Sequence, residues 1–142
     1  MTQLVESKQL INVELKLPVQ PYDIDFAGVV SNIVYIRWLE DLRVALVSAC
    51  FSLSEMVEQD IAPILLETSI QYKQPVVLFD LPIGRMWMSK MKYLRWTVSA
   101  EILVGEKLVA TAEQIGCFIN LSSRKPVSIP KELSQAFRLR EP

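Results

Sequence analysis

The sequence predicts a single α+β domain in which a strongly curved antiparallel sheet wraps one long, apolar helix. Three observations lead to this fold class. The chain has 142 residues, which is the usual length of one domain. Apolar residues recur at helical spacing from about 31 to 50, and the region 61–121 has the composition and alternation of strands. Because a helix that is apolar around most of its circumference is largely buried, a wrapping sheet is its natural partner.

The first half of the domain is expected to contain one strand, one loop and the long helix. Residues 10–17 alternate imperfectly, as a strand does. The following segment DIDFAGVVSN is a loop punctuated by Gly28. The helix then starts with Ser31 or Asn32 as its N-cap. Its many β-branched residues mean that packing, rather than helix propensity, must stabilise it.

The second half is expected to be mostly sheet. Residues 51–60 form a short second helix or a turn, with Ser54 as its cap. Gly105 marks a hairpin turn, and Gly84 inside a strand suggests a bulge or a strong bend. The tail is an extended exit followed by a short amphipathic helical turn. Strands are predicted near 61–73, 76–91, 94–104 and 107–121.

Composition excludes several function classes. The 15 basic and 16 acidic residues give a net charge of −1, so we expect no nucleic-acid partner. The chain has no histidine, which excludes Ser-His-Asp and Cys-His nucleophile systems and the usual His-containing zinc sites. Catalysis must therefore depend on carboxylates, amides, hydroxyls, lysines or backbone donors.

The cysteines and the apolar runs predict a cytoplasmic protein. Cys50 and Cys117 have no CxxC spacing and are expected to be free thiols in a reducing compartment. The start of the chain lacks the apolar core of a secretory signal. Charged residues interrupt every apolar run before the length of a membrane span, so we expect none.

The loop before the long helix contains the most unusual residues. Asp23, Asp25 and Gly28 match an EF-hand at three positions, but two other ligand positions hold Ala27 and Val34. A phosphate loop is excluded by the two acids. A carboxylate beside a helix N-terminus can instead serve acyl transfer, because the unpaired backbone N–H groups can hold an oxyanion. The alternative is that both aspartates only cap the turn and the helix.

Other polar residues allow two interpretations. Glu40 falls between apolar positions of the helix, so it either pairs structurally with Arg43 or orients the site. Asn32 and Tyr35 lie in the first helical turns and either cap and pack or contact a substrate. Four basic residues of the strand region are either solvated surface charges or contacts for the phosphates of a nucleotide-bearing carrier, namely Lys73, Lys90, Lys92 and Arg95.

The run VQPYDIDFAGVVSNIVYIRWLEDLRVAL resembles the signature of the hotdog-fold acyl-CoA thioesterases of the 4-hydroxybenzoyl-CoA thioesterase type. The shared pattern is D-x-D-x-x-G-[VI]-[VI], followed after a few residues by Y-x-x-[WFY]-x-E-x-x-R. The closing KPVSIPKEL resembles the usual end of the family, and the resemblance covers about residues 10–135. The matching residues are Asp23, Asp25, Gly28, Val29, Val30, Tyr35, Trp38, Glu40 and Arg43.

This resemblance implies a fold, a reaction and an assembly. The fold is a single hotdog domain over 1–142, with five to six strands around the helix. Asp25 is the catalytic carboxylate, as nucleophile or as general base, and a backbone N–H near Asn32 polarises the thioester carbonyl. Glu40 supports the site. The protein is a homo-oligomer, a dimer or tetramer with active sites at the dimer interface, and it needs no cofactor and no metal. Substrate contacts are expected at Tyr22, Gly28, Val29, Tyr35, Lys73, Lys90 and Arg95.

One departure from the family pattern narrows the substrate. Many short-chain members have histidine at the position of Asn32, whereas the aromatic-acyl branch often lacks it. The lack of histidine also disfavours the hotdog dehydratases. We therefore expect hydrolysis of an aryl or short- to medium-chain acyl-CoA. Two alternatives stay open: a thioesterase for acyl carrier protein or long-chain substrates, with Met86, Trp87 and Met88 along an acyl tunnel, and a non-catalytic acyl-binding module.

Overall fold

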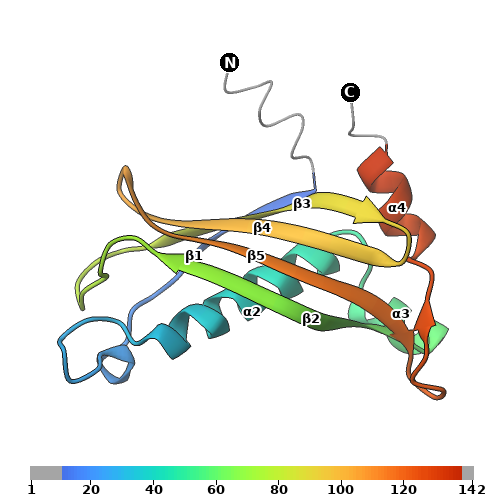
Figure 1. The fold of residues 1–142 in the computed structure, drawn as a ribbon, viewed down its shortest axis with the longest axis horizontal. Helices are drawn as coiled ribbons and strands as arrows, with labels where there is room; N and C mark the ends of the chain where they lie inside the picture. Colours follow the sequence, from blue (N-terminus) through green and yellow to red (C-terminus); the bar gives the residue numbers. More distant parts are fainter. Residues whose placement is uncertain (1–10, 139–142) are drawn as a thin grey trace.

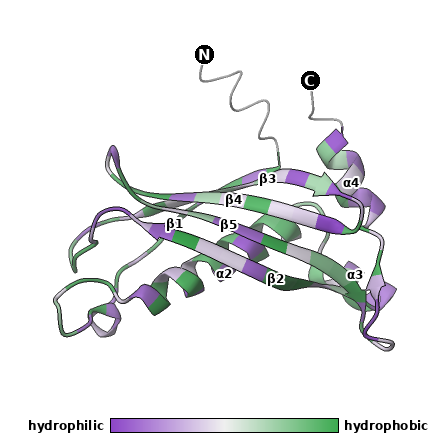
Figure 2. Cartoon of the chain, in the orientation of Figure 1, coloured by the Kyte–Doolittle hydropathy of each residue, from purple (hydrophilic) through white to green (hydrophobic). Residues whose placement is uncertain are grey.

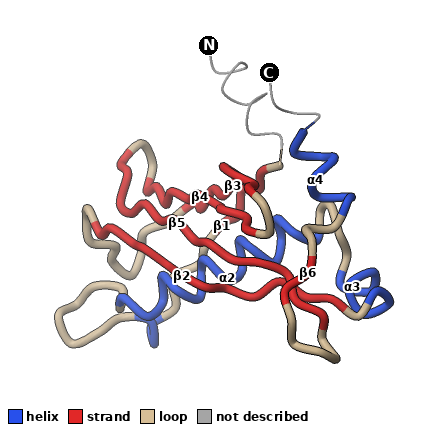
Figure 3. Tube along the Cα trace, turned by 45° about the vertical axis from the view of Figure 1, so that its right-hand side comes forward, coloured by secondary structure: helices blue, strands red, loops and turns tan. Residues whose placement is uncertain are grey.

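The computed structural model describes residues 11–138, so the ten residues before and the four after this range of the predicted domain lie outside it. Figures 1 and 3 show a curved sheet with the long helix α2 along its concave face, as the sequence predicts. In chain order the elements are β1 (Asn12–Lys16), the 3-10 turn η1 (Pro21–Asp23), α2 (Asn32–Ser48), α3 (Leu53–Gln59), β2 (Ile61–Tyr72), β3 (Ile83–Lys92), β4 (Arg95–Val104), β5 (Lys107–Asn120), β6 (Pro126–Val127) and α4 (Lys131–Arg138).

The six strands form one antiparallel sheet. Five of them follow the order β1-β3-β4-β5-β2, and the short β6 pairs with β5. The strands β1 and β2 therefore lie at the two edges. The hairpin turn between β4 and β5 contains Gly105 at a φ of 62°, which confirms the predicted turn. The register places Tyr72 opposite Ala110 and Ile64 opposite Cys117, so the two ends of β2 mark the two ends of the sheet.

The helix α2 begins where the sequence predicts, and Ser31 is its N-cap. One face of the helix packs on the sheet and buries Tyr35, Trp38, Leu39, Leu42 and Leu46. Full burial of each such apolar side chain contributes about 1.5–3 kcal/mol, which compensates for the weak helix propensity.

The prediction that α2 is buried nearly all round is wrong. Ile33, Ile36, Glu40 and Val44 are exposed, because the sheet of one chain covers only one face of the helix. Glu40 therefore does not lie on a buried apolar face. An apolar stripe formed by Ile33, Ile36 and Val44 is left facing outward.

The predicted strand 76–91 is shorter in the structure, because residues 73–82 form a loop. Pro75 and Pro82 cannot donate to a strand ladder, and the carboxylate of Asp80 accepts from the Val77 N–H at 2.9 Å instead. The predicted bulge at Gly84 is also wrong. A Cβ at this position would lie 2.7 Å from Leu17 Cδ1 and 2.9 Å from Leu42 Cδ1, so the glycine permits close packing. The irregularity of β3 lies instead between Met88 and Lys90.

The remaining elements agree with the sequence except for one cap. The short helix α3 is capped by Ser52, which forms a capping box with Glu55, and not by Ser54. The tail ends in α4, whose Leu133 is buried. Cys117 is buried in β5 with a free thiol. Within residues 11–138, no helix combines the length and apolarity that crossing a membrane requires.

Candidate functional site

The loop that contains Asp25 is a small, closed hairpin directly before α2. Ile24 and Val30 form an antiparallel bridge at its base. Inside it, the Asp25 N–H donates to the Val29 carbonyl and the Gly28 N–H donates to the Asp25 carbonyl, both at 2.9 Å. Gly28 has a φ of 83°, a conformation that favours glycine. These bonds give Asp25 a defined backbone position.

The side chain of Asp25 is exposed but oriented. Its Oδ1 accepts a 2.8 Å hydrogen bond from the Ala27 N–H. In the part of the chain that the structure describes, no group pairs with Oδ2. A carboxylate held by one oxygen and open at the other can take a proton from water or attack a carbonyl.

The start of α2 leaves one backbone donor open beside this loop. The Ser31 side chain accepts from the Ile33 N–H at 3.4 Å, and the Ser31 carbonyl accepts from the Val34 N–H at 2.9 Å. Among residues 11–138 no acceptor pairs with the N–H of Asn32, the first residue of the helix. The positive end of the helix dipole adds to this donor, so the position suits a developing oxyanion.

Tyr35 supports the same end of α2 from inside. Its ring is buried and packs edge-on against Trp38 and Tyr72, with ring centroids 5.2 and 5.0 Å apart. Burial, and to a lesser degree the neighbouring Tyr72, raises the pKa of Tyr35. The residue ties the first turns of the helix to the end of β2.

Most of the other predicted contacts lie at this end of the molecule, which we call the loop end: residues 17–31 together with 73–82 (left in Figure 1). The Val30 N–H donates to the Val76 carbonyl at 2.8 Å and joins the two segments. Tyr22 is exposed in η1, Val29 is half-buried, and Lys73 is exposed just after β2. The structure thus brings together Tyr22, Asp25, Gly28, Val29, Asn32, Tyr35 and Lys73.

Glu40 lies further along α2. It is eight residues beyond Asn32, or about 12 Å along the helix axis. The guanidinium of Arg43 pairs with it, as the sequence predicts, and also donates to Gln114 Oε1 at 2.7 Å. The two charged residues stand at the edge of a pocket of about 340 Å³ between α2, α3 and β2. The rest of its lining is mostly apolar and consists of Val44, Val47, Ser48, Leu53, Met56, Ala62 and Pro63.

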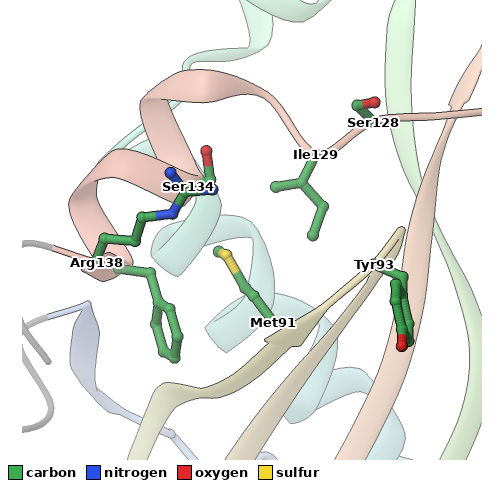
Figure 4. Close-up of a pocket in the computed structure, with 7 residues that line it drawn as sticks. Met91, Tyr93, Ser128, Ile129, Ser134 and Arg138 are labelled. Carbon is green, nitrogen blue, oxygen red and sulfur yellow. The ribbon is translucent and has the colours of Figure 1, made fainter.

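Lys90 and Arg95 lie at the opposite end of the sheet, where β3 turns into β4. Arg95 pairs with Cys117, whose other neighbour is Ile64 at the start of β2. Within one chain these two cations are therefore remote from Asp25. A second pocket, of about 330 Å³, lies at this end between α4 and the β3–β4 turn (Figure 4). Its lining includes Tyr93 and Arg138 but none of the predicted site residues.

Sequence reasoning missed two polar contacts. Asp23 forms an ion pair with Arg37, fourteen positions along the chain, and no local pattern reveals this pairing. Gln114 is buried beneath α2, where it links Arg43 to Thr68. A signal for Gln114 exists, because it is the polar member of an otherwise apolar, inward-facing set that includes Ala112 and Phe118 in β5. Within residues 11–138, no three Asp, Glu or Cys side chains cluster as metal ligands would.

The fold and the loop together define a hotdog-type domain with an exposed carboxylate before its central helix. The sequence matches the thioesterase-like superfamily over residues 19–137. The chain therefore belongs to this superfamily and is a hydrolase that acts on thioester bonds, as the sequence motif predicts.

Three similar proteins support the assignment. A candidate esterase of Aquifex aeolicus (strain VF5) is 27% identical over 121 residues, covering 84% of this chain and 93% of its own. The crystal structure of Slr0204, a 1,4-dihydroxy-2-naphthoyl-CoA thioesterase from Synechocystis, has a TM-score of 0.80 at 24% identity, over 92% of this chain and 99% of that one. A Staphylococcus aureus protein solved in complex with CoA has a TM-score of 0.82 at 18% identity, over 93% of this chain and 85% of that one.

Proposed function

We propose that the protein hydrolyses an aryl or short- to medium-chain acyl-CoA to the free acid and CoA. One observation carries this proposal: the oriented, open carboxylate of Asp25 directly precedes the helix whose first N–H, that of Asn32, has no partner among the described residues. A base or nucleophile and an oxyanion donor are the two parts that thioester hydrolysis needs.

Two routes use these parts. In the first, Asp25 removes a proton from water as the water oxygen bonds to the thioester carbonyl carbon. The charge moves to the carbonyl oxygen, which accepts from the Asn32 N–H. The C–S bond then breaks, and the CoA thiolate is protonated. In the second, Asp25 itself adds to the carbonyl and expels the thiolate, and water hydrolyses the resulting anhydride.

A second copy of the chain would complete the site. The edge strand β2 is long and apolar, with Leu65 and Leu66 partly exposed, and it lies beside the outward stripe of α2 (Figure 2). Such an edge favours pairing with another strand. Antiparallel pairing of two β2 strands would place the Tyr72 end of one copy beside the Ile61 end of the other.

This dimer accounts for the predicted residues that one chain keeps apart. At the Ile61 end lie Lys90, Arg95 and the pocket beside Glu40. In the dimer these groups of one copy would approach Asp25 of the other. The pocket would receive the acyl group, and the cations, with Lys73 of the first copy, would meet the CoA phosphates. CoA as the thiol carrier is supported by Slr0204, a CoA thioesterase, and by the CoA-bound Staphylococcus aureus structure.

The long-chain alternative has less support in the structure. Met86 and Met88, expected along an acyl tunnel, are buried in the packed core. A pocket of about 340 Å³ suits an aryl or short- to medium-chain group better than a long chain. The carrier-protein alternative and the non-catalytic binding module are separated from the proposal by experiment.

The test is free-thiol release from aryl-, short- and long-chain acyl-CoAs and from an acyl carrier protein thioester. We expect activity on one acyl-CoA class, with kcat about 10²–10⁴-fold lower in Asp25→Asn, since general base catalysis contributes this much. Asp41→Asn, another exposed aspartate, is the matched control and should leave kcat unchanged. Unchanged turnover in Asp25→Asn contradicts the mechanism. Activity confined to the carrier thioester, or thermal stabilisation by acyl-CoA without hydrolysis, supports an alternative instead.

A further inference from the structure

Asp23, the first aspartate of the motif, is buried whereas Asp25 is exposed. Its carboxylate is only 3% exposed and both oxygens are engaged. Oδ1 accepts from Arg37 Nη2 at 2.8 Å, and Oδ2 accepts from the Gln20 N–H at 2.9 Å. Burying a charge is costly unless it is paired and hydrogen-bonded, so the position of this carboxylate is strongly specified by its partners.

The backbone of Asp23 joins the two ends of the catalytic loop. Its carbonyl accepts from the Ser31 N–H at 2.9 Å, and the adjacent Ile24 bridges Val30. Arg37 extends from α2 five residues after Asn32, so its bond to Asp23 fixes the loop base against the first turns of the helix. Asp23 is thus connected to the loop with Asp25 and to the helix with Asn32.

Helix capping does not explain this arrangement. The N-cap of α2 is Ser31, whose side chain accepts from the Ile33 N–H. Asp23 meets instead a residue of the second helical turn. Because it is buried, it also has no access to a substrate. Its contacts are those of a group that sets the distance between two other groups.

We propose that Asp23 and Arg37 form a positioning pair that holds the Asp25 carboxylate in reach of the oxyanion donor at Asn32. The proposal rests on the proposed function of Asp25. A misplacement of about 1 Å can lower a rate about 10²-fold, although the reacting groups themselves are intact. Loss of the pair should therefore lower kcat about 10- to 100-fold and leave KM for acyl-CoA nearly unchanged.

The first experiment compares Arg37→Gln with Arg85→Gln. Arg85 forms a surface ion pair with Glu14 of the same 2.8 Å length, far from the loop, and is the matched control. We expect kcat per folded molecule to fall only in Arg37→Gln and to recover partly in Arg37→Lys, which keeps the cation. A lower melting temperature with unchanged kcat overturns the proposal, because it shows a merely structural pair.

The second experiment needs no substrate. Hydrogen exchange of the Ala27 and Gly28 amides, which bond to Asp25, should accelerate in Arg37→Gln and not in Arg85→Gln. If the wild type hydrolyses no acyl-CoA while this exchange changes as expected, the pair holds the loop and the proposed function fails separately. Unchanged exchange overturns the positioning role. Should Arg37→Gln fold poorly, the double variant Asp23→Asn/Arg37→Gln removes both charges and is measured in the same two ways.

Discussion

The Arg43 guanidinium of α2 donates a 2.7 Å hydrogen bond to the side-chain oxygen of Gln114, a residue of β5 that is 1% exposed. The Gln114 amide in turn donates to Thr68 Oγ1 at 3.2 Å, on the edge strand β2. Since Arg43 also pairs with Glu40, a continuous polar chain connects the outer face of the helix with the sheet edge. Any shift of this edge would be transmitted to Glu40.

The polar chain makes the stability of the protein sensitive to Gln114. Gln114→Leu removes the acceptor of a largely buried guanidinium, so we expect a loss of about 1–3 kcal/mol in the free energy of unfolding. Arg43→Met/Gln114→Leu removes donor and acceptor together and should recover part of this loss. Urea unfolding of the single and double variants measures both values. A double variant less stable than Gln114→Leu would contradict this account.

Gly116 is the glycine with the least space. A Cβ there would lie 2.1 Å from the Trp96 ring and 2.3 Å from the backbone oxygen of Ile64, which cannot move aside alone. We expect Gly116→Ala to cost about 1–3 kcal/mol or more by overpacking. Gly105→Ala is the control: it meets no atom within 4 Å but has a φ of 62°, so only backbone strain of about 1–2 kcal/mol is expected. Equal melting temperatures for Gly116→Ala and wild type would show that the sheet relaxes around the methyl group.

The sequence predicts the elements whose signal is local. The cap at Ser31, the turn at Gly105 and the long alternating strands follow from backbone chemistry within a few residues. The loop 73–82 was missed because its apolar residues resemble a strand, although two prolines exclude a regular ladder. The roles of the two aspartates could not be separated, since only the position of Arg37 on the folded helix decides that Asp23 is the buried one.

The buried hydroxyl of Tyr35 makes stability depend on alkaline pH. Burial raises the pKa of Tyr35 in the folded state, so the folded protein holds this proton more tightly than the unfolded chain. The contribution is complete below the unfolded pKa of about 10 and is lost as the pH rises through the folded pKa. Tyr35→Phe should therefore lose less melting temperature than wild type between about pH 9 and 11. Tyr93→Phe, whose ring is 88% exposed, should follow the wild type, and parallel curves for all three proteins would contradict this assignment.

The edge strand β2 gives a test of the proposed dimer. Leu66→Lys places a charge among the exposed apolar residues of this edge, and a lysine at a strand edge opposes pairing. We expect the wild type to sediment with twice the 16.2 kDa mass of the chain and the variant to sediment as a single chain. Leu81→Lys is the control, because Leu81 is as apolar and more exposed but lies in the loop next to β1, where the Pro82 carbonyl accepts from the Leu17 N–H.

Activity of the same variant decides whether one chain contains a complete site. Lys90, Arg95 and Glu40 lie far from Asp25 of their own chain, so a monomer keeps the carboxylate and the oxyanion donor but loses the groups of the second copy. KM for acyl-CoA should then rise more than kcat falls, since binding contacts are removed while Asp25 and Asn32 are intact. A monomeric Leu66→Lys that hydrolyses acyl-CoA with wild-type KM would show that the loop end alone binds the substrate, and that the pocket beside Glu40 serves another purpose.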